Sequence, residues 1–418
     1  MTNKIDSKIS VIGTGYVGKP LIEELSNTFE VIAYDINKTK IETHRKNNTN
    51  KNIYYTYEEK DIRNADAIIV CVPTPVDDNN TPNLKYIDLA CETIGKNIKK
   101  NTLIIFESSY MPTCTEEHCI PLLEKYSNMK YNKDFYVGYS PERINPGDKK
   151  NTLNSITKLI SASNDNVLER MEKIYSSING INLYKVKDIK IAELSKLVEN
   201  CQRDINIAFV NELSKLCHSL SIDINNVLDA ASTKWNFSRY NPGLVGGDCV
   251  GVNSYYLMNL ANKYNVSLDV LKTARNVNLD IIKFIVDELD KMILNINQET
   301  DLNNIKITIY GYSYKENIPD VSNTRVIELY EELKKRNYNV NICDNIVEPS
   351  LCKHKINNKD INDNDVIILA VPHEKYSKWE TKEILKKYKD NSKYKIFIDI
   401  KSKYKNLKNI KEINYWNL

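Results

Sequence analysis

The spacing of apolar residues near the start of the chain predicts alternating strands and helices. Apolar runs at residues 8–15 and 29–35 flank a helical pattern, and two more runs follow at 65–75 and 101–109. The last two are continuous apolar runs, which are typical of strands buried on both faces of a parallel sheet. We therefore expect a first domain, residues 1–187, built around a doubly wound sheet.

The same order of elements returns near the C-terminus. Four apolar runs repeat the earlier ones in order, at 305–313, 338–344, 365–373 and 395–402. Asp344 ends the second of these runs, as Asp35 ends its counterpart. Such repetition predicts a second Rossmann-like domain, which we place at residues 298–418.

The middle of the chain, residues 188–297, lacks strand-like runs and has helical spacing instead. Its apolar residues recur at intervals of three and four, at Ile191, Leu194, Leu197, Val198, Cys201 and Ile205. This stripe predicts a long helix of the kind that links two domains and packs against a partner subunit. The predicted fold class is therefore α/β, with two Rossmann-like doubly wound parallel-sheet domains joined by a central helical domain that forms a homodimer.

The turn after the first strand carries a dinucleotide-binding pattern. Gly13, Gly15 and Gly18 form GxGxxG, in which the first allows a tight turn and the second lets backbone approach a pyrophosphate. The third lets the helix pack closely on the strand. Asp35 can accept hydrogen bonds from the adenosine ribose and repel a 2′-phosphate, so the pattern predicts NAD rather than NADP as the cofactor.

The second Rossmann-like domain lacks this glycine pattern. We therefore do not expect it to bind a dinucleotide in the usual way, and the nucleotide part of a substrate is its natural ligand. The alternative is a second sheet that binds no ligand, because a fold does not by itself determine a function.

Composition and charge exclude several other classes of protein. The 418 residues carry a formal net charge of +3, and the basic residues are interleaved with acidic ones, so no nucleic-acid partner is expected. No apolar run is long enough to span a membrane, and the polar start MTNKIDSK does not resemble a signal peptide. We expect a cytoplasmic protein without a membrane partner.

The nine cysteines are scattered, without a CxxC pair or a Cys/His cluster at metal-ligand spacing. This pattern argues against a disulfide framework and a structural metal site, and most thiols, such as Cys71, are expected to be small buried hydrophobes. Cys249 is different because it lies among four glycines, Gly243, Gly246, Gly247 and Gly251. Glycines let a ligand and the backbone approach closely, so Cys249 is a candidate nucleophile.

Three further side chains are candidates to assist this thiol. Lys196 and Asn200 are four residues apart on the predicted long helix, so both project from one face and can stabilise an oxyanion. A thiol with a pKa of about 8.5 needs a nearby cation, for which Lys196 is the candidate. Glu142 follows the apolar run FYVGY and could position or deprotonate a water. Taken alone, each of these residues would more often be an exposed surface side chain.

Several stretches together closely resemble the UDP-glucose/GDP-mannose dehydrogenase family, and within it the UDP-N-acetylglucosamine and UDP-N-acetylgalactosamine 6-dehydrogenases. They cover nearly the whole chain, in the order GTGYVGKPL, CVPTPVDDNNTPNL, GYSPERINPGD, the KLVEN helix, TKWNF with PGLVGGDCVGV, GYSYKENIPDVSNTRV and AVPHEKY. The resemblance implies three domains, which are NAD-binding, central helical and UDP-binding.

The resemblance also implies which residues contact each ligand. NAD would be bound by Gly13, Gly15, Tyr16, Val17, Gly18, Asp35, Lys40, Thr74 and Ser109. The UDP-sugar would be bound by Ser238, Arg239, Tyr240, Asn241, Pro242, Gly246 and Lys315. The loop at 238–242 could also reach a neighbouring subunit.

The implied reaction is an NAD-dependent four-electron oxidation of the 6-hydroxymethyl group of a UDP-hexose or UDP-N-acetylhexosamine to the uronic acid, for surface polysaccharide or glycan precursor synthesis. Cys249 would capture the aldehyde as a thiohemiacetal, which is oxidised to a thioester and then hydrolysed. Lys196 and Asn200 would stabilise the oxyanion, and Glu142 would serve the water.

The chain departs from the family pattern at several positions near these motifs. Asn253 stands where the family has an aspartate that assists the lysine and the water. Other replacements are Asp248 for histidine, Ser254 for proline, Ser322 for the arginine of a DxR pattern that contacts NAD, Ser109 for threonine and Thr113 for glycine. Arg325, three residues after Ser322, is a candidate substitute for the missing arginine.

Two other functions stay open. A single-step β-hydroxyacid dehydrogenase shares the Rossmann domain and a Lys-xxx-Asn helix, but it needs neither Cys249 nor a second Rossmann-like half. A non-catalytic or weakly active nucleotide-sugar-binding paralogue would account for the changes at Asn253 and Ser322, because a supporting carboxylate and a cofactor-binding cation are lost there.

Overall fold

The computed structural model describes residues 6–77, 79–144, 147–148 and 150–418. The chain forms two compact units, one made of Met1–Glu199 with Tyr255–Val266 and the other of Asn200–Ser254 with Ser267–Leu418. The motif residues Asp78, Asn145 and Pro146 lie outside the described part. Because the middle region is shared between the two units, the three domain boundaries drawn from the sequence stay a prediction.

The first unit is built on an eight-stranded sheet in the order β3-β2-β1-β4-β5-β6-β7-β8. Neighbouring strands are parallel except β6 and β7, which are antiparallel. The strands are β1 (Lys8–Ile12), β2 (Glu30–Tyr34), β3 (Ile53–Thr56), β4 (Ala67–Val70), β5 (Thr102–Phe106), β6 (Phe135–Tyr139), β7 (Thr157–Ala162) and β8 (Asn182–Lys185). The first six strands have the Rossmann order, which confirms the predicted fold of this part.

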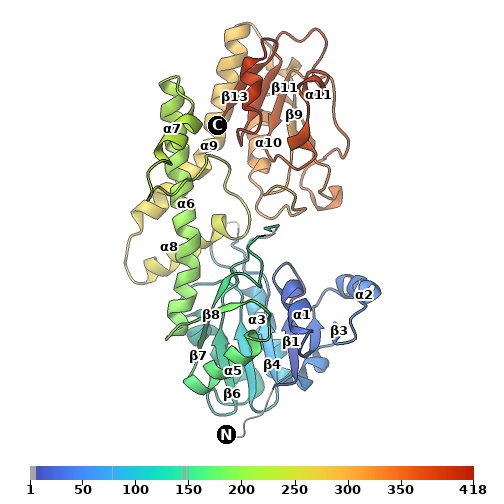
Figure 1. Cartoon of the computed structure of the whole chain (residues 1–418), viewed down its shortest axis with the longest axis vertical. Coiled ribbons are helices and arrows are strands. Elements are labelled where there is room, and N and C mark those ends of the chain that lie inside the picture. Colours follow the sequence, from blue (N-terminus) through green and yellow to red (C-terminus); the bar gives the residue numbers. More distant parts are fainter. Residues whose placement is uncertain (1–5, 78, 145–146, 149) are drawn as a thin grey trace. The chain divides into compact units, whose positions relative to one another are not determined.

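Helices and buried strands form the core of this unit. Strands β4 and β5 are buried along their whole length, as their continuous apolar runs predict. The helices are α1 (Gly18–Leu25), α2 (Lys38–Asn47), α3 (Lys85–Asn97), α4 (Ile120–Ser127) and α5 (Asp165–Tyr175), several of which are seen beside the strands in Figure 1. β7 and β8 at one edge of the sheet and β3 at the other extend it beyond the strands that the sequence predicted.

The second unit contains a five-stranded parallel sheet in the order β10-β9-β11-β12-β13. Its strands are β9 (Lys306–Tyr310), β10 (Asn339–Cys343), β11 (Val366–Leu369), β12 (Ile396–Asp399) and β13 (Asn414–Asn417). Helices α10 (Val326–Lys335) and α11 (Thr381–Leu385) lie beside them (Figure 1). The order reverses next to the first strand in both sheets, so the second sheet repeats the first without a counterpart of β3. This confirms the second Rossmann-like half.

The turn after the first strand of each sheet has the same backbone geometry. Gly13 follows β1 with a φ of +93°, and Gly311 follows β9 with a φ of +89°. A Cβ atom on Gly13 would lie 2.6 Å from the carbonyl oxygen of Cys71, and one on Gly311 would clash with that of Val371. Both positions therefore require glycine, because the turn passes very close to the neighbouring strand end.

Four helices follow the first sheet in sequence. They are α6 (Ile189–Ser219), α7 (Ile224–Ala231), α8 (Val250–Lys263) and α9 (Asp269–Ile296). The long helix predicted from the apolar stripe is α6, and it contains 31 residues. Only part of the stripe is buried: Leu197 and Cys201 are buried, whereas Ile191, Leu194 and Val198 are exposed. α6 therefore presents apolar side chains to its surroundings.

The second half of α6 is held against the second sheet. His218 stacks on Trp416 with ring centroids 4.8 Å apart, and its Nε2 lies 2.9 Å from the carbonyl oxygen of Asn417. At the start of α7, the Asp223 carboxylate lies 2.5 Å from Lys408 Nζ. The segment that carries Cys249 is thus part of the same unit as the second sheet.

Two classes of feature are missing from the described ranges. None of the helices there combines the length and the apolar character that crossing a membrane requires. Those ranges also contain no group of three or more His, Cys, Asp or Glu side chains placed to hold a metal ion.

Candidate active site

The turn between β1 and α1 fits a pyrophosphate. A Cβ atom on Gly18 would clash with the carbonyl oxygen of Gly13, so the third glycine is needed for α1 to pack on β1. At Gly15, by contrast, the nearest atom to such a Cβ is Lys40 Nζ at 3.9 Å, which leaves the backbone open on that side. Open backbone before a helix N-terminus suits an anion, because N–H groups and the helix dipole point toward it.

Asp35 follows β2 and forms an acidic site beside this turn. Its Oδ2 accepts hydrogen bonds from the backbone and hydroxyl of Thr14 at 3.0 Å and lies 2.9 Å from Lys40 Nζ. Its Oδ1 accepts the Asn37 N–H at 3.0 Å. Burial acts to raise the pKa of Asp35, but the hydrogen bonds from Thr14 and Lys40 outweigh it and lower the pKa below its ordinary value. Asp35 is therefore ionised, and Oδ1 keeps capacity for a ribose hydroxyl.

Asp344, the counterpart of Asp35 in the second sheet, is arranged differently. It is fully buried, and its Oδ2 accepts the Tyr312 N–H at 2.6 Å and lies 2.9 Å from His373 Nε2. Its Oδ1 accepts backbone N–H groups from Ile346 and Val347. Protein donors therefore occupy both carboxylate oxygens of Asp344, whereas Asp35 keeps one oxygen available for a ribose hydroxyl. This difference agrees with the expectation that the second half binds no dinucleotide in the usual way.

The other residues predicted to contact NAD lie around the ends of β1, β4 and β5. Tyr16 is exposed, and Val17 is partly buried just before α1. The Thr74 hydroxyl donates a hydrogen bond of 2.5 Å to the Ser109 carbonyl, which ties the two strand ends together. The Tyr256 hydroxyl lies 3.2 Å from the Thr74 carbonyl. Carboxyl ends of parallel strands are where such sheets bind nucleotides.

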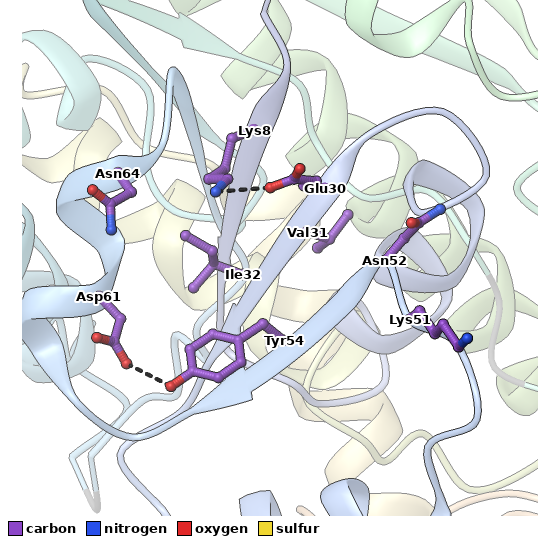
Figure 2. A pocket seen from close by; sticks show the side chains of 9 residues that line it. All are labelled: Lys8, Glu30, Val31, Ile32, Lys51, Asn52, Tyr54, Asp61 and Asn64. Carbon is purple, nitrogen blue, oxygen red and sulfur yellow. Dashed lines mark hydrogen bonds and ion pairs between the residues drawn. The ribbon is translucent and has the colours of Figure 1, made fainter.

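A separate cavity lies at the opposite edge of the first sheet. Figure 2 shows its lining, which includes the first residues of β1 and β2, Lys8 and Glu30, paired at 2.7 Å. Tyr54 donates a hydrogen bond to Asp61 at 3.3 Å across another part of the lining. The cavity has a volume of about 250 Å³. None of the residues that the sequence predicted for the site lines it.

Cys249 lies at the N-terminus of α8. It is exposed, whereas Cys71 and six other cysteines are buried and Cys352 is partly buried, as the sequence predicted for most thiols. The Cys249 carbonyl accepts the N–H groups of Val252 at 3.3 Å and Asn253 at 3.0 Å, so it begins the first turn of the helix. The positive end of the helix dipole favours a thiolate there, a contribution that the sequence did not reveal.

Asn200 and Asn253 bury amide groups near this helix start. Each is 3% exposed, and the amide nitrogen of each has no hydrogen-bond acceptor among the described residues. The helices touch one residue further along, where the Ser254 hydroxyl lies 3.8 Å from the Cys201 sulfur. A buried donor without an acceptor is destabilising, so these two amides are candidates for binding a ligand oxygen.

Lys196 lies one helical turn before Asn200 on α6, so both project from the same side. Both side chains are buried, which argues against the alternative that the pair belongs to the surface. The predicted catalytic residues are divided between the two units. Glu142 and Lys196 belong to the first, whereas Asn200, Cys249 and Asn253 belong to the second.

The glycines around Cys249 have a different role from the one expected. We expected them to leave room for a ligand, but protein atoms occupy the space that their Cβ atoms would need. A Cβ would lie 2.9 Å from Lys401 Nζ at Gly243, 2.7 Å from Asn323 O at Gly246, 2.7 Å from the Tyr314 ring at Gly247 and 2.9 Å from Asn323 Nδ2 at Gly251. Gly246 and Gly247 require glycine because this loop packs directly on loops of the second sheet, whereas at Gly243 the flexible end of Lys401 could move aside.

Glu142 follows β6 and is buried, unlike an ordinary loop glutamate. Its carboxylate accepts the Ile144 N–H, and its own N–H donates to the Glu107 carbonyl at 3.3 Å. The Glu107 carboxylate is itself buried, 2.9 Å from Lys158 Nζ and 2.5 Å from the Tyr175 hydroxyl. Burial raises the pKa of Glu107, Lys158 lowers it and Glu142 raises it, so Glu142 is electrostatically coupled to this buried pair.

Asp248 and Ser322, two departures from the family pattern, interact with each other. Asp248 is exposed as a residue, but neighbouring protein atoms partly desolvate its carboxyl. This desolvation raises the pKa of Asp248, the Asp320 carboxylate raises it further, and a hydrogen bond with Ser322 lowers it. The Ser322 N–H donates to Asp320 Oδ1 at 2.8 Å, which fixes the group. The two replacements therefore form one local arrangement beside Cys249.

The residues predicted to bind the nucleotide sugar all lie in the second unit. Arg239 is exposed and pairs with Asp229 at 2.5 Å. Lys315 is partly buried, and its carbonyl accepts the Ser313 hydroxyl at 2.7 Å. Of the others, exposed residues are Ser238 and Asn241, partly buried ones are Tyr240 and Gly246, and the buried one is Pro242. Their contacts with substrate stay a prediction.

Glu193 is a buried carboxyl on α6 that the sequence did not single out. It accepts hydrogen bonds from the Thr113 N–H at 2.7 Å, the Thr115 N–H at 3.0 Å and the Thr115 hydroxyl at 2.6 Å. Thr113 has a φ of +74°, a backbone conformation that glycine adopts more readily than threonine. Burial raises the pKa of Glu193 to about 7, although the hydrogen bonds from Thr115 and Thr113 lower it.

Glu193 is expected to make the protein less stable as the pH rises. Its pKa in the fold lies above its ordinary value of 4.5, so its contribution is complete below about pH 4.5 and is lost as the pH passes through 7. The loss amounts to about 3 kcal/mol, at about 1.4 kcal/mol per pKa unit. Urea unfolding at a series of pH values should show this slope, and Glu193→Gln should flatten it. An equal change in Glu212→Gln, at an exposed site of the same helix, would contradict this assignment.

The fold and the site together define the class of this protein. It is a dinucleotide-dependent oxidoreductase in which NAD binds the first sheet and a second Rossmann-like half is built for another ligand. Models of the UDP-glucose/GDP-mannose dehydrogenase family match its NAD binding domain at residues 7–179, its central domain at 190–280 and its UDP binding domain at 308–406. The chain belongs to this family, as the motifs predicted.

Individual relatives span nearly the whole chain. Protein CapL of Staphylococcus aureus is 41% identical over 390 residues, which cover 89% of this chain and 91% of CapL. The UDP-N-acetyl-D-glucosamine 6-dehydrogenase of Pseudomonas aeruginosa is 36% identical over 398 residues, which cover 91% of this chain and 94% of that enzyme. The solved structure of the UDP-D-ManNAc dehydrogenase of Pyrococcus horikoshii has a TM-score of 0.86 at 25% identity and covers 98% of both chains.

Proposed function

We propose that this chain oxidises the 6-hydroxymethyl group of a UDP-hexose or UDP-N-acetylhexosamine to the carboxylate, for surface polysaccharide or glycan precursor synthesis. The family and its named relatives support an NAD-dependent oxidation of a UDP-sugar. The finer proposal rests on the exposed Cys249 at a helix N-terminus, close in sequence to a buried amide nitrogen of Asn253 that lacks an acceptor in the described chain. A nucleophile with N–H donors suits a covalent acyl intermediate.

The proposed chemistry balances as two oxidations and one hydrolysis. In each of the two oxidations NAD, when bound, accepts the hydride from the sugar carbon, one NAD for each oxidation, and the hydroxyl proton passes to solvent. After the first oxidation, Cys249 Sγ bonds to the aldehyde carbon and the carbonyl oxygen takes up the thiol proton. The thiohemiacetal then loses a hydride and a proton and becomes a thioester. Water adds to the thioester carbon, the C–S bond breaks with its electrons on Sγ, and the carboxylate leaves.

The other proposed catalytic residues act on the substrate oxygen and on the attacking water. Lys196 and Asn200 would donate to the substrate oxygen as it becomes negative, and Glu142 would accept a proton from the attacking water. Asn253 would donate its amide N–H but cannot accept the proton that an aspartate could.

The test is a stoichiometric assay with the purified chain. It is incubated with NAD or NADP and with UDP-glucose, UDP-N-acetylglucosamine, UDP-N-acetylgalactosamine or UDP-N-acetylmannosamine, and NADH absorbance and product mass are followed. We expect two NADH per sugar, an acid as product and a strong preference for NAD. One NADH per sugar, with an aldehyde or ketone as product, would favour the single-step dehydrogenase. Binding without turnover would favour the non-catalytic paralogue.

Replacing Asn253 by aspartate is expected to raise turnover. The residue is buried next to the start of α8, where a carboxylate could accept a proton or hold a lysine charged, and an amide cannot. Restoring one acid-base group should raise kcat by about tenfold or more with little change in KM. Steady-state kinetics of Asn253→Asp and of the native chain, under the same conditions, give the comparison.

Asp248 provides the competing explanation and the control. If Asp248 has taken over the carboxylate role, Asn253→Asp leaves turnover unchanged whereas Asp248→Asn abolishes it. Its carboxyl has a raised pKa, which is the direction a base near Cys249 would need. The double variant Asn253→Asp with Asp248→His restores the family pattern at both positions. If Asn253→Asp leaves turnover unchanged and Asp248→Asn abolishes it, the asparagine at position 253 does not weaken the enzyme.

We also propose that the chain forms a homodimer through α6. Exposed apolar side chains, 40–57% accessible, follow one face of this helix at Ile191, Leu194, Val198, Phe209 and Leu216, and at Leu220 directly after its last residue. A continuous apolar stripe of this kind is typical of a contact surface. Sedimentation should give the mass of two chains, and Phe209→Lys with Leu216→Lys should give that of one. A native monomer would contradict the proposal.

A further inference from the structure

The loop that leads to Cys249 is held by one residue of the connection between β9 and α10. The Gly247 N–H donates to the Asn323 carbonyl, and the Asn323 side-chain Nδ2 donates to the Gly247 carbonyl, both at 3.2 Å. Two hydrogen bonds between the same two residues fix both polar groups of Gly247. Because Gly247 lies two residues before Cys249, this pairing restricts the backbone that carries the thiol.

Backbone geometry makes this pairing specific. Asn323 has a φ of +47° and Gly247 a φ of +78°. Asparagine is one of the few residues besides glycine that tolerate the left-handed region, and its short amide can still reach the opposite backbone. The next residue, Thr324, donates its hydroxyl to the Tyr312 carbonyl at 2.7 Å, which anchors the segment just beyond the end of β9. The loop that carries Asn323 is therefore anchored to the chain at the end of β9.

The contact extends to both sides of the thiol. A Cβ atom on Gly246 would lie 2.7 Å from the Asn323 carbonyl oxygen, and one on Gly251 would lie 2.9 Å from its Nδ2. These glycines precede and follow Cys249, so Asn323 packs against the loop before the thiol and against the first turn of α8 after it. A shift of Asn323 would therefore displace the start of this helix, where the dipole favours the thiolate.

We infer that Asn323 is a positioning residue for Cys249. It holds the thiol at the N-terminus of α8. The position of Cys249 in the proposed covalent step therefore depends on a loop that follows β9 of the second sheet. The inference rests on the proposed function for its effect on turnover. The placement of the thiol itself can be measured without any substrate.

Two substitutions distinguish the effect of the Asn323 side chain from the effect of its backbone conformation. Asn323→Asp keeps the shape and the tolerance for positive φ, but it places an oxygen where Nδ2 donates to Gly247. Asn323→Gly keeps the φ value and removes the side chain. The rate at which iodoacetamide alkylates Cys249 is measured against pH in the full chain, and the modified peptide is quantified by mass spectrometry. We expect a decrease of about threefold to tenfold for Asn323→Asp, the size of one hydrogen bond, and a smaller decrease for Asn323→Gly.

Asn337 supplies a matched control in the same unit. It is exposed, has a φ of +67° and follows α10, so Asn337→Asp makes the same chemical change at a similar backbone conformation. This control is expected to keep the native alkylation rate. The inference is wrong if Asn323→Asp alkylates within about twofold of the native rate, which is less than one hydrogen bond would change. It is equally wrong if Asn337→Asp slows the reaction as much.

Turnover provides the second readout. Asn323→Asp should lower kcat by a similar factor while KM for NAD and UDP-sugar changes by less than about twofold, because uniform binding is not affected. A lower thermal midpoint with unchanged alkylation and kcat would mean that Asn323 is only structural. If the native chain turns over no UDP-sugar and Asn323→Asp still slows alkylation, the proposed function fails and the positioning role stands.

Discussion

Replacing Cys249 by alanine is expected to stop the formation of uronic acid and to leave at most one NADH per sugar. Without Sγ the aldehyde has no covalent carrier, so the second oxidation loses its substrate. Removing the nucleophile of a catalytic group lowers turnover by about a thousandfold or more. The measurement is NADH per sugar together with the mass of the product, and an aldehyde-trapping reagent such as hydroxylamine should capture the intermediate.

Two variants control this experiment. Cys352→Ala removes a partly buried thiol from the same unit and should behave as the native chain. Cys249→Ser keeps a hydroxyl of similar size, so it separates the loss of the nucleophile from the loss of packing at the start of α8. If Cys249→Ala still yields two NADH per sugar, the thioester route is excluded.

Replacing Lys196 by alanine is expected to lower turnover by about 10² to 10³ while NAD binding stays nearly unchanged. The ammonium group is buried on α6, where water cannot replace it as a donor to a developing oxyanion. The residues predicted to contact NAD lie at the ends of β1, β2, β4 and β5, so we expect NAD binding not to depend on this charge. Steady-state turnover and a fluorescence titration with NAD provide the two measurements.

Lys190→Ala is the matched control for this prediction. Lys190 lies on the same helix but is exposed and pairs with Glu116 at 3.7 Å, so its loss should leave turnover unchanged. Lys196→Met keeps the apolar stem and removes only the charge, which separates packing from electrostatics. Normal turnover in Lys196→Met would show that the ammonium group has no catalytic role.

The two substitutions can also be combined. If the two substitutions act independently, their effects on turnover should add. If both residues act in one covalent step, the double variant should be little slower than Cys249→Ala alone. Simple addition of the two effects would contradict a shared step.

Much of the fold could be predicted because it is recorded in local patterns. Continuous apolar runs marked β4 and β5, since a strand buried on both faces needs apolar side chains at every position. Gly13 and Asp35 marked the cofactor site, because a close backbone approach and a terminal carboxylate depend on residue type at short spacing. β3, β7, β8 and β13 were not predicted: β7 pairs antiparallel with β6, and none of these four segments is a continuous apolar run.

The candidate site was predicted less completely. Cys249 and Lys196 could be named, because a thiol among glycines and a lysine at helical spacing are visible in the sequence. The partners of those glycines could not be named, since Asn323 follows Gly247 by 76 residues and contacts it only through the folded second unit. Glu193 carried no signal either, because its burial depends on the loop at 113–115.

The sequence by itself therefore determined the two Rossmann-like sheets, the NAD turn at Gly13 and the identity of the candidate nucleophile, because each is a pattern within a short segment. Tertiary structure alone decided that Cys249 begins α8, that Asn323 holds the preceding loop and that burial raises the pKa of Glu193 to about 7. The physical reason is that hydrogen-bond partners and desolvation depend on residues distant in the chain, which only the packed fold brings into contact.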